Sequence, residues 1–443
     1  PLIDFEAVTL DHAKNSDGKT PLISSDYEYQ TLIPWGTPLK QGINEYNGDP
    51  NTRPTAAEQA DMVGIGHDGM WFFPETARGR LSNSSGVICI NHEFGRNSHV
   101  LGKDAPESIE DVKLSQHAHG VAVVYVHKKM NGEWTHGFNN LNRRIHVNTD
   151  VEFSGPVAGS ELLANPASNE PKGTVNNCSS GYTPWGTYLT CEENFNGYFG
   201  ATNWDPEAEE YNSGWTPSEE DDRYGIGESG FGYGWENFDE RFDLNNPNYS
   251  NEVNRFGWVV EIDPSNPEAK PVKRTALGRF KHEGATFTTG QDGRAVVYMG
   301  DDQRFDYIYK YVSARGYAQM MTEFETSPEE YNHPLDEGTL YVARFNEDGT
   351  GDWLALDYDS NTDLQARFAN QAEVLTYARI AADIVGATPM DRPEWISVGP
   401  NGDVFCTLTN NSRRTVADAA NPLAPNADGH IIRWHDSDNH TGT

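Results

Sequence analysis

Residues 294–313 read RAVVYMGDDQRFDYIYKYVS, and this stretch indicates the kind of fold that the chain adopts. Its two ends, 294–300 and 307–313, are short runs rich in β-branched and aromatic residues, which favour extended strands. The segment between them is polar and rich in aspartate, as turns often are. The stretch therefore predicts two short strands joined by a polar connection.

Similar runs recur along the chain. They are GVAVVYVHK at 120–128, GWVVEIDP at 257–264, TLYVARF at 339–345, GDVFCTLTN at 402–410 and HIIRWH at 430–435. Asp-Gly and Asn-Gly pairs in residues 346–353 and 399–405 supply the positive φ of tight hairpins, so antiparallel pairing follows.

Many short strands with tight turns predict an all-β protein. A β-propeller fits best, because it closes radially and grows without enlarging any one core. We expect a single propeller domain over residues 1–443, with a few inserted helices such as 371–386 and one beginning at Thr55. A pair of β-sandwich domains is the alternative, since no strict blade repeat is visible.

The chain changes character at 204–258, which is acidic, aromatic and rich in glycine. We interpret residues 204–256 as a long loop insertion between strands. Such an insertion can act as a lid over a site or can lie in solvent without a role in the chemistry. Both interpretations stay open.

The charge balance restricts the partners. The chain has 33 Lys and Arg against 67 Asp and Glu, a net charge of −34. This field repels phosphate backbones, so we expect no nucleic-acid partner. Bound cations, with calcium as the first candidate, would relieve the self-repulsion; an ordinary acidic surface is the alternative.

The ends and the cysteines bear on localisation. The chain begins at Pro1 without an initiator Met, as a processed chain would, so we expect a periplasmic or secreted protein. No run of eighteen apolar residues predicts a membrane span. Cys89, Cys178, Cys191 and Cys406 are too few for a disulfide scaffold but could form one or two bridges.

Residues 176–194, NNCSSGYTPWGTYLTCEEN, place a cysteine in a polar, turn-forming context close to a carboxylate pair. A thiolate such as that of Cys178 suits iron, zinc or copper, whereas carboxylates suit hard cations such as calcium. One site with both donors would hold more than one kind of metal. Taken alone, the pattern also fits a structural cysteine.

Other carboxylates occupy similar settings. Glu93 follows a short apolar run, Glu283 lies between two runs that predict strands, and Asp301 and Asp302 stand at a strand end. A propeller gathers such strand ends around its central channel. An acidic cluster there would repel itself strongly unless cations neutralised it.

Arg392 and Glu394 are two residues apart and share one face of an extended segment. Arg392 could bind a phosphate or carboxylate through its bidentate fork. An ion pair between Arg392 and Glu394 is the alternative.

Together these motifs resemble the PhoX-type alkaline phosphatase family. The resemblance rests on HDGMWFFP (67–74), NHEFG (91–95), residues 176–199, KHEGA (281–285), YMGDD (298–302), GTLYVARF (338–345) and DRPEW (391–395), which occur in order. It implies a six-bladed β-propeller, exported across the inner membrane, that hydrolyses phosphomonoesters with a cluster of ferric (Fe³⁺) and calcium (Ca²⁺) ions.

The resemblance also assigns residues. The family's iron-binding cysteine falls on Cys178, and its arginine that contacts phosphate falls on Arg392. The metal-binding carboxylates that it implies are Glu193, Glu283 and Glu394, with Glu93 and Asp301 added because they stand in shared motifs. Residues 421–434 depart from the family pattern, so no ligand is assigned there.

We therefore predict a monomeric phosphatase of small phosphomonoesters that uses metal-assisted attack. One alternative is a calcium-dependent propeller hydrolase of lactones or other esters, which has no use for a thiolate. The other is a non-catalytic, calcium-stabilised binding propeller that presents residues 204–258 to a partner.

Overall fold

A computed structural model describes residues 6–9, 14, 21–77, 79–201, 204–205, 210–211 and 214–443. Within these residues the strands form four sheets and one two-stranded ribbon. The first sheet has the order β1 (His67–Ala77), β2 (Arg80–His92), β3 (Gly120–Lys128) and β4 (Trp134–His136), and β5 (Arg143–Ile145) also pairs with β3. The second has the order β6 (Glu152–Ser154), β12 (Val272–Arg274), β11 (Val259–Ile262), β8 (Tyr188–Glu192) and β7 (Asn177–Tyr182).

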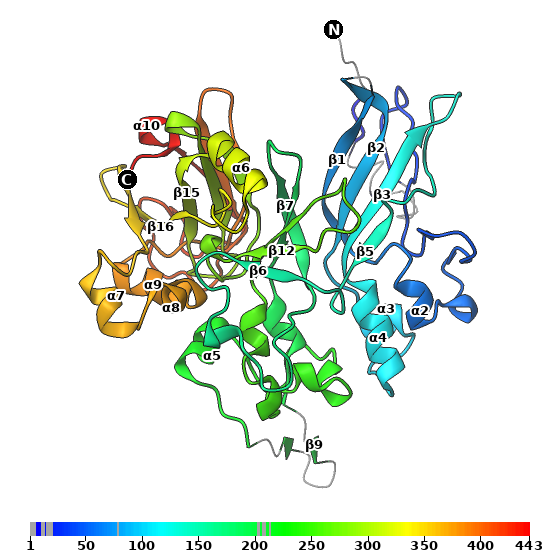
Figure 1. Ribbon diagram of the computed structural model, residues 1–443, viewed down its shortest axis with the longest axis horizontal. Helices are drawn as coiled ribbons and strands as arrows, with labels where there is room; N and C mark the ends of the chain where they lie inside the picture. The colour runs from blue at the N-terminus through cyan, green and yellow to red at the C-terminus, as the bar shows by residue number, and fades with distance from the viewer. Residues whose placement is uncertain are drawn as a thin grey trace.

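The third sheet has the order β13 (Thr286–Thr289), β14 (Arg294–Gly300), β15 (Ile308–Gly316), β16 (Gly338–Phe345) and β17 (Gly351–Ala355). The fourth consists of β18 (Pro393–Val398), β19 (Asp403–Leu408) and β20 (His430–His435), and the ribbon of β9 (Trp204–Asp205) and β10 (Glu210–Tyr211). Figure 1 shows the sheets following one another across the molecule, with β1 to β3 at one side, β7 in the middle and β15 and β16 at the other.

Helices fill the connections. They are α2 (Ala56–Gln59), α3 (Asn97–Val100), α4 (Ile109–Ala118), α5 (Glu219–Tyr224), α6 (Tyr317–Thr326), α7 (Thr362–Arg367), α8 (Gln371–Thr376), α9 (Ala378–Val385) and α10 (Ser437–His440). Short 3-10 helices occur at Pro50–Thr52, Glu161–Leu163, Phe195–Tyr198, Trp235–Asn237, Glu240–Phe242, Pro247–Tyr249, Glu252–Arg255, Thr275–Leu277 and Gln291–Gly293.

The strand β14 explains why the run 294–300 is apolar throughout. Alternate side chains of a strand point to opposite faces. Val296 and Tyr298 pack into the core shared with the fourth sheet, whereas Val297 and Met299 pack into the core shared with the second sheet. Both faces of the third sheet are therefore covered, as stacked neighbouring sheets require.

The predicted β architecture is confirmed in its coarse form. The strands pair antiparallel, except that β12 pairs with β6 in parallel. The expected short strands are present, and β14 and β15 correspond to the two strands expected in residues 294–313. The six blades that the resemblance implies are not confirmed, because the described residues contain four sheets of three to five strands.

The predicted helices are also present, with one difference. The side chain of Thr55 and that of Glu58 form the reciprocal hydrogen bonds of a capping box before α2. The helix expected over 371–386 ends at Gly386 but is broken into α8 and α9 at Tyr377, whose φ is −113°.

The segment expected as a loop insertion, 204–256, lies partly outside the described residues, at 206–209 and 212–213. Its later part is not a solvated loop. Trp235 and Phe242 are fully buried. They pack with Phe199 and Phe256 in an aromatic core that is separate from the cores between the sheets. Whether this segment acts as a lid stays a prediction.

The four cysteines are buried and free, so the bridges that the sequence left open are absent. In the part of the chain that the structure describes, every helix is too short or too polar to cross a bilayer.

Acidification is expected to destabilise the fold through His119. This ring is fully buried, and its burial lowers its pKa from 6.5 to about 4. Between these pH values the unfolded chain binds a proton that the folded chain does not, so the free energy of unfolding falls as the pH falls, by about 1.4 kcal/mol per pH unit for this group. Urea unfolding at pH 7 and pH 5 measures the loss.

In His119→Gln this part of the pH dependence should disappear, because glutamine keeps a donor and an acceptor without titrating. His99→Gln, at an exposed position, is the matched control. An equal pH dependence in wild type and His119→Gln would contradict the prediction.

Candidate metal centre

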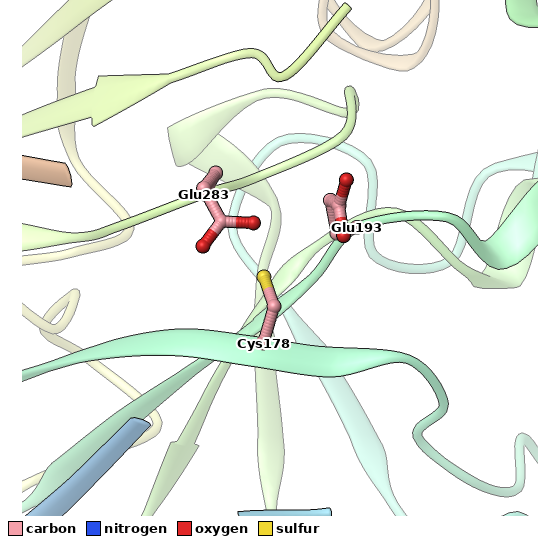
Figure 2. A group of neighbouring side chains, drawn as sticks. All are labelled: Cys178, Glu193 and Glu283. Carbon is pink, nitrogen blue, oxygen red and sulfur yellow. The ribbon is translucent and has the colours of Figure 1, made fainter. Parts of the chain in front are cut away.

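One thiol and two carboxylates meet in the interior. Cys178 lies on β7, Glu193 directly follows β8, and Glu283 precedes β13. One potential ligand atom from each lies within 4.8 Å of the other two, and Figure 2 shows the three side chains pointing toward one another. Their exposed fractions are 1%, 4% and 7%. Three predicted ligands are thus brought together, and we call them the Cys178 cluster.

An irregularity between β7 and β8 aims Cys178 into this cluster. The register shifts between the pairs Asn177–Glu192 and Ser180–Thr190, which leaves one extra residue on β7. A bulge of this kind bends its strand and redirects a side chain, and bulges are frequent beside functional sites.

Asn176, which directly precedes β7, holds the backbone of Glu193 in place. Its φ of 50° is a left-handed conformation, which asparagine tolerates better than most residues. The Asn176 carbonyl accepts a hydrogen bond from the Glu193 amide at 3.1 Å, and its side-chain oxygen accepts one from the Asn194 amide at 2.7 Å.

The neighbouring Glu192 turns to the opposite side. Its carboxylate accepts hydrogen bonds from Lys273 Nζ at 2.7 Å and from the amides of Gly257 and Trp258 at 2.9 and 3.0 Å. Of the two adjacent glutamates, one is neutralised inside the second sheet, and only Glu193 faces the cluster.

Asp301 is neutralised in the same way. Its carboxylate accepts two hydrogen bonds from the guanidinium of Arg379, that from Nε at 2.8 Å, and a third from the Lys281 amide at 3.2 Å. Asp301 and Arg379 are both fully buried. The structure does not bring Asp301 into the Cys178 cluster and favours an ion-pair role, so its role as a metal ligand stays a prediction.

Asp302 is the better placed of the two aspartates. The Glu283 amide donates to the Gly300 carbonyl and the Asp302 amide to the Lys281 carbonyl, each at 3.0 Å, which sets Glu283 and Asp302 on adjacent extended segments. Asp302 Oδ1 is buried and has no hydrogen-bond partner among the described residues. The sequence showed both aspartates, but alternation along a strand lets only one of them face the cluster.

Glu93 and Glu394 are half-buried beside the same carboxylates. Burial and then the charges of Asp68, Asp302 and Glu394 together raise the pKa of Glu93 to about 7. Burial, and then the charge of Asp302, also raises the pKa of Glu394. Asp68 is a further acid of the site that the sequence did not single out, because one acid within the 67–74 motif looks like many others in this chain.

Arg392 lies at the edge of this acidic group. Its Nη2 donates to Asp302 Oδ2 at 2.6 Å and lies 3.4 Å from Glu394 Oε1, while the Thr409 hydroxyl also donates to Glu394. Its φ of 61° is left-handed, a strained conformation that for arginine indicates a functional constraint. The Arg392 side chain is 26% exposed, so it contacts both the carboxylates and the solvent.

The donor set fits metal ions. Burial raises the pKa of Cys178, Glu193 and Glu283 well above their usual ranges, and the neighbouring acids of the site add to this. Lys281 is the cation that opposes the effect on Glu193. Buried acids with so little compensation are stable as anions only when cations bind them. A thiolate among carboxylates suits a metal such as iron together with harder cations.

Comparisons with known proteins agree with this site. The profile of the family described as "Alkaline phosphatase PhoX" matches residues 7–443. Among solved structures, the chain is similar to "Pseudomonas fluorescens PhoX in complex with vanadate, a transition state analogue", at 42% sequence identity and a TM-score of 0.85. The match covers 95% of this chain and 72% of that chain. The search of curated proteins finds no match. The predicted phosphatase family is therefore confirmed.

Removing Arg379 should destabilise the protein. In Arg379→Met the buried carboxylate of Asp301 loses its partner, which typically costs about 3–5 kcal/mol. The double variant Arg379→Met, Asp301→Asn should recover part of this loss, because it removes the unpaired charge. Chemical denaturation measures both.

Arg344→Met is the matched control, because its ion pair with Asp352 lies at the surface and should contribute little. A double variant no more stable than Arg379→Met would contradict a simple ion-pair role for Asp301.

Proposed function

This chain belongs to the PhoX family of alkaline phosphatases, and on this premise we propose that the Cys178 cluster holds the metal ions with which it hydrolyses phosphomonoesters. The observation that carries the proposal is a buried thiol within 4.8 Å of two buried carboxylates, in a group of acids with little compensating positive charge. Hydrolysis cleaves the ester P–O bond with one water and releases the alcohol and inorganic phosphate.

The metals that we propose are ferric iron and calcium. Cys178 supplies the soft donor that iron accepts, and Glu193 and Glu283 supply carboxylates beside it. Glu93 and Glu394 would extend the site toward harder cations, with Asp302 as an additional ligand candidate. When bound, such ions supply Lewis-acid stabilisation of the charge on the phosphoryl oxygens.

Arg392 is the residue that we propose for substrate binding and catalysis. Its guanidinium is anchored by Asp302 and the side chain is still 26% exposed, so N–H donors remain for phosphoryl oxygens. Donors fixed before the reaction stabilise developing charge without reorganisation. The cation also lessens the repulsion between a dianionic ester and a chain of net charge −34.

The number of blades, the oligomeric state and the location are also proposals. The sheets described here would be four blades of a six-bladed propeller, which a crystal structure would count directly. We propose a monomer, which light scattering would test, and a periplasmic or secreted location, which cell fractionation would test.

Metal removal is expected to abolish turnover. Elemental analysis of the purified protein should find iron and calcium, and exhaustive chelation should remove both the metals and the hydrolysis of p-nitrophenyl phosphate. The melting temperature should fall as well, because the buried acids lose their cations. Full activity after complete metal removal would contradict the proposal.

Cys178→Ser tests the thiolate ligand. We expect loss of iron and a fall in kcat of at least about 100-fold, since metal stabilisation of the transition state is worth several kcal/mol. Cys89→Ala, which removes another buried thiol, should keep its iron. If Cys178→Ser retains both iron and activity, Cys178 is a structural residue. The alternative of a calcium-dependent lactone hydrolase, which needs no thiolate, predicts this result for activity.

Arg392→Ala should lower kcat about 10²–10³-fold, the usual effect of deleting one fixed donor to a transition state. Because a vanadate complex is known for the similar solved structure, inhibition by vanadate should weaken in parallel with kcat/KM. Arg344→Ala, at the surface of the third sheet, is the control. Weakened substrate binding with unchanged kcat and unchanged vanadate inhibition would contradict the catalytic role.

A further inference from the structure

A cavity of about 310 Å³ lies between the start of α3 and residues 231–233. These residues belong to the segment 204–256, which we call the aromatic segment. Its walls include the rings of Phe94, Phe231 and Tyr233. Two of these rings are unusually open for large apolar side chains, since Phe94 is 44% and Phe231 59% exposed. Pockets of this size and character commonly hold small molecules.

The cavity adjoins the metal centre. Phe94 directly follows Glu93 in the chain. The ring of Tyr233 stacks on that of Tyr198 at 4.4 Å, and the Tyr198 hydroxyl lies 3.4 Å from the Glu93 carbonyl. Tyr233 and Arg96 both line the cavity, so these contacts connect its wall with the backbone of Glu93.

The aromatic walls are held in position. The Phe231 amide donates to the Gly197 carbonyl at 2.8 Å, and the Phe231 ring lies so close to Gly197 that an added Cβ would approach it to 2.2 Å. On the other side, Asn97 Nδ2 donates to the Tyr233 carbonyl at 3.1 Å. The rings therefore form a preformed surface on which a planar group can stack without reordering the walls.

Arg96 is the cation of the same walls. It is exposed and forms no ion pair or side-chain hydrogen bond among the residues that the structure describes, although Asp104 also lines the cavity and the chain carries a net charge of −34. Its guanidinium N–H groups are therefore available to an anionic group of a ligand.

We infer that this cavity binds the leaving group of the substrate, and that it favours a planar aromatic leaving group that carries a second anionic group, as nucleosides with an additional phosphate do. The ring stacks on Phe94 and Phe231, and Arg96 contacts the second anion. This inference rests on the proposed function, because the scissile phosphate must lie at the metal centre beside Glu93.

The rings are tested with two substrates of the holoenzyme. We expect Phe231→Leu, and to a similar degree Phe94→Leu, to raise KM for adenosine 5′-monophosphate about tenfold, because each removes an aromatic face on which the base stacks. KM for glycerol 3-phosphate, which has no ring, should stay within about twofold. Phe138→Leu, another exposed phenylalanine, is the matched control.

The arginine is tested with a second phosphate. Arg96→Gln should raise KM for adenosine 3′,5′-bisphosphate at least about fivefold more than KM for adenosine 5′-monophosphate, since the loss of one charge-assisted hydrogen bond costs about that much. The melting temperatures of all variants should equal that of the wild type.

Binding of adenosine itself, measured by calorimetry, separates the two levels of inference. If the wild type hydrolyses neither ester, the proposed function fails, and adenosine binding that is lost in Phe231→Leu would still support the cavity. If the wild type hydrolyses both esters but the variants change both KM values equally, or neither, the cavity does not select the leaving group.

Discussion

The arrangement of this molecule depends on one electrostatic constraint, the burial of several carboxylates and a thiol in one place. Carboxylates in a low-dielectric interior repel one another and lose their hydration, so they need cations or protons. The backbone around the Cys178 cluster is specialised to keep these groups together, with a bulge at Cys178, a left-handed residue at Asn176 and the close pairing of 281–283 with 300–302. A buried group of ligand atoms held by the backbone in this way is suited to bind metal ions.

The same constraint explains the basic residues behind the site. Each adjacent pair of acids is divided, so that Lys273 neutralises Glu192 and Arg379 neutralises Asp301. Further ion pairs then tie α5 to the sheet and to α9, because Arg223 bridges the carboxylates of two more aspartates, Asp306 and Asp383. Glu193 and Glu283, which face the cluster, form no ion pair among the residues that the structure describes, and Asp302 and Glu394 share Arg392 as their partner. The interior thus separates charge that stabilises the fold from charge that is left for metals.

The aromatic segment gains its place from the same region. Its buried rings, Trp235 and Phe242, anchor it in an aromatic core. Tyr233 of this segment stacks on Tyr198, whose hydroxyl lies next to the Glu93 carbonyl. A segment that reads as an acidic loop therefore forms one wall of a cavity beside the metal centre.

The sequence by itself determined that the fold consists mainly of antiparallel strands. It also determined the family and most of the residues that meet at the site, because these follow from local patterns and motifs. Cys178, Glu193 and Glu283 stand in motifs that can be recognised without coordinates. The tertiary structure decided which of Asp301 and Asp302 faces the cluster, since that depends on where Arg379 of a distant helix lies. It also decided the burial of the aromatic segment and the cavity beside Phe94. Such contacts join residues far apart in the chain, as Asp301 and Arg379 are at 78 positions, and no local pattern specifies them.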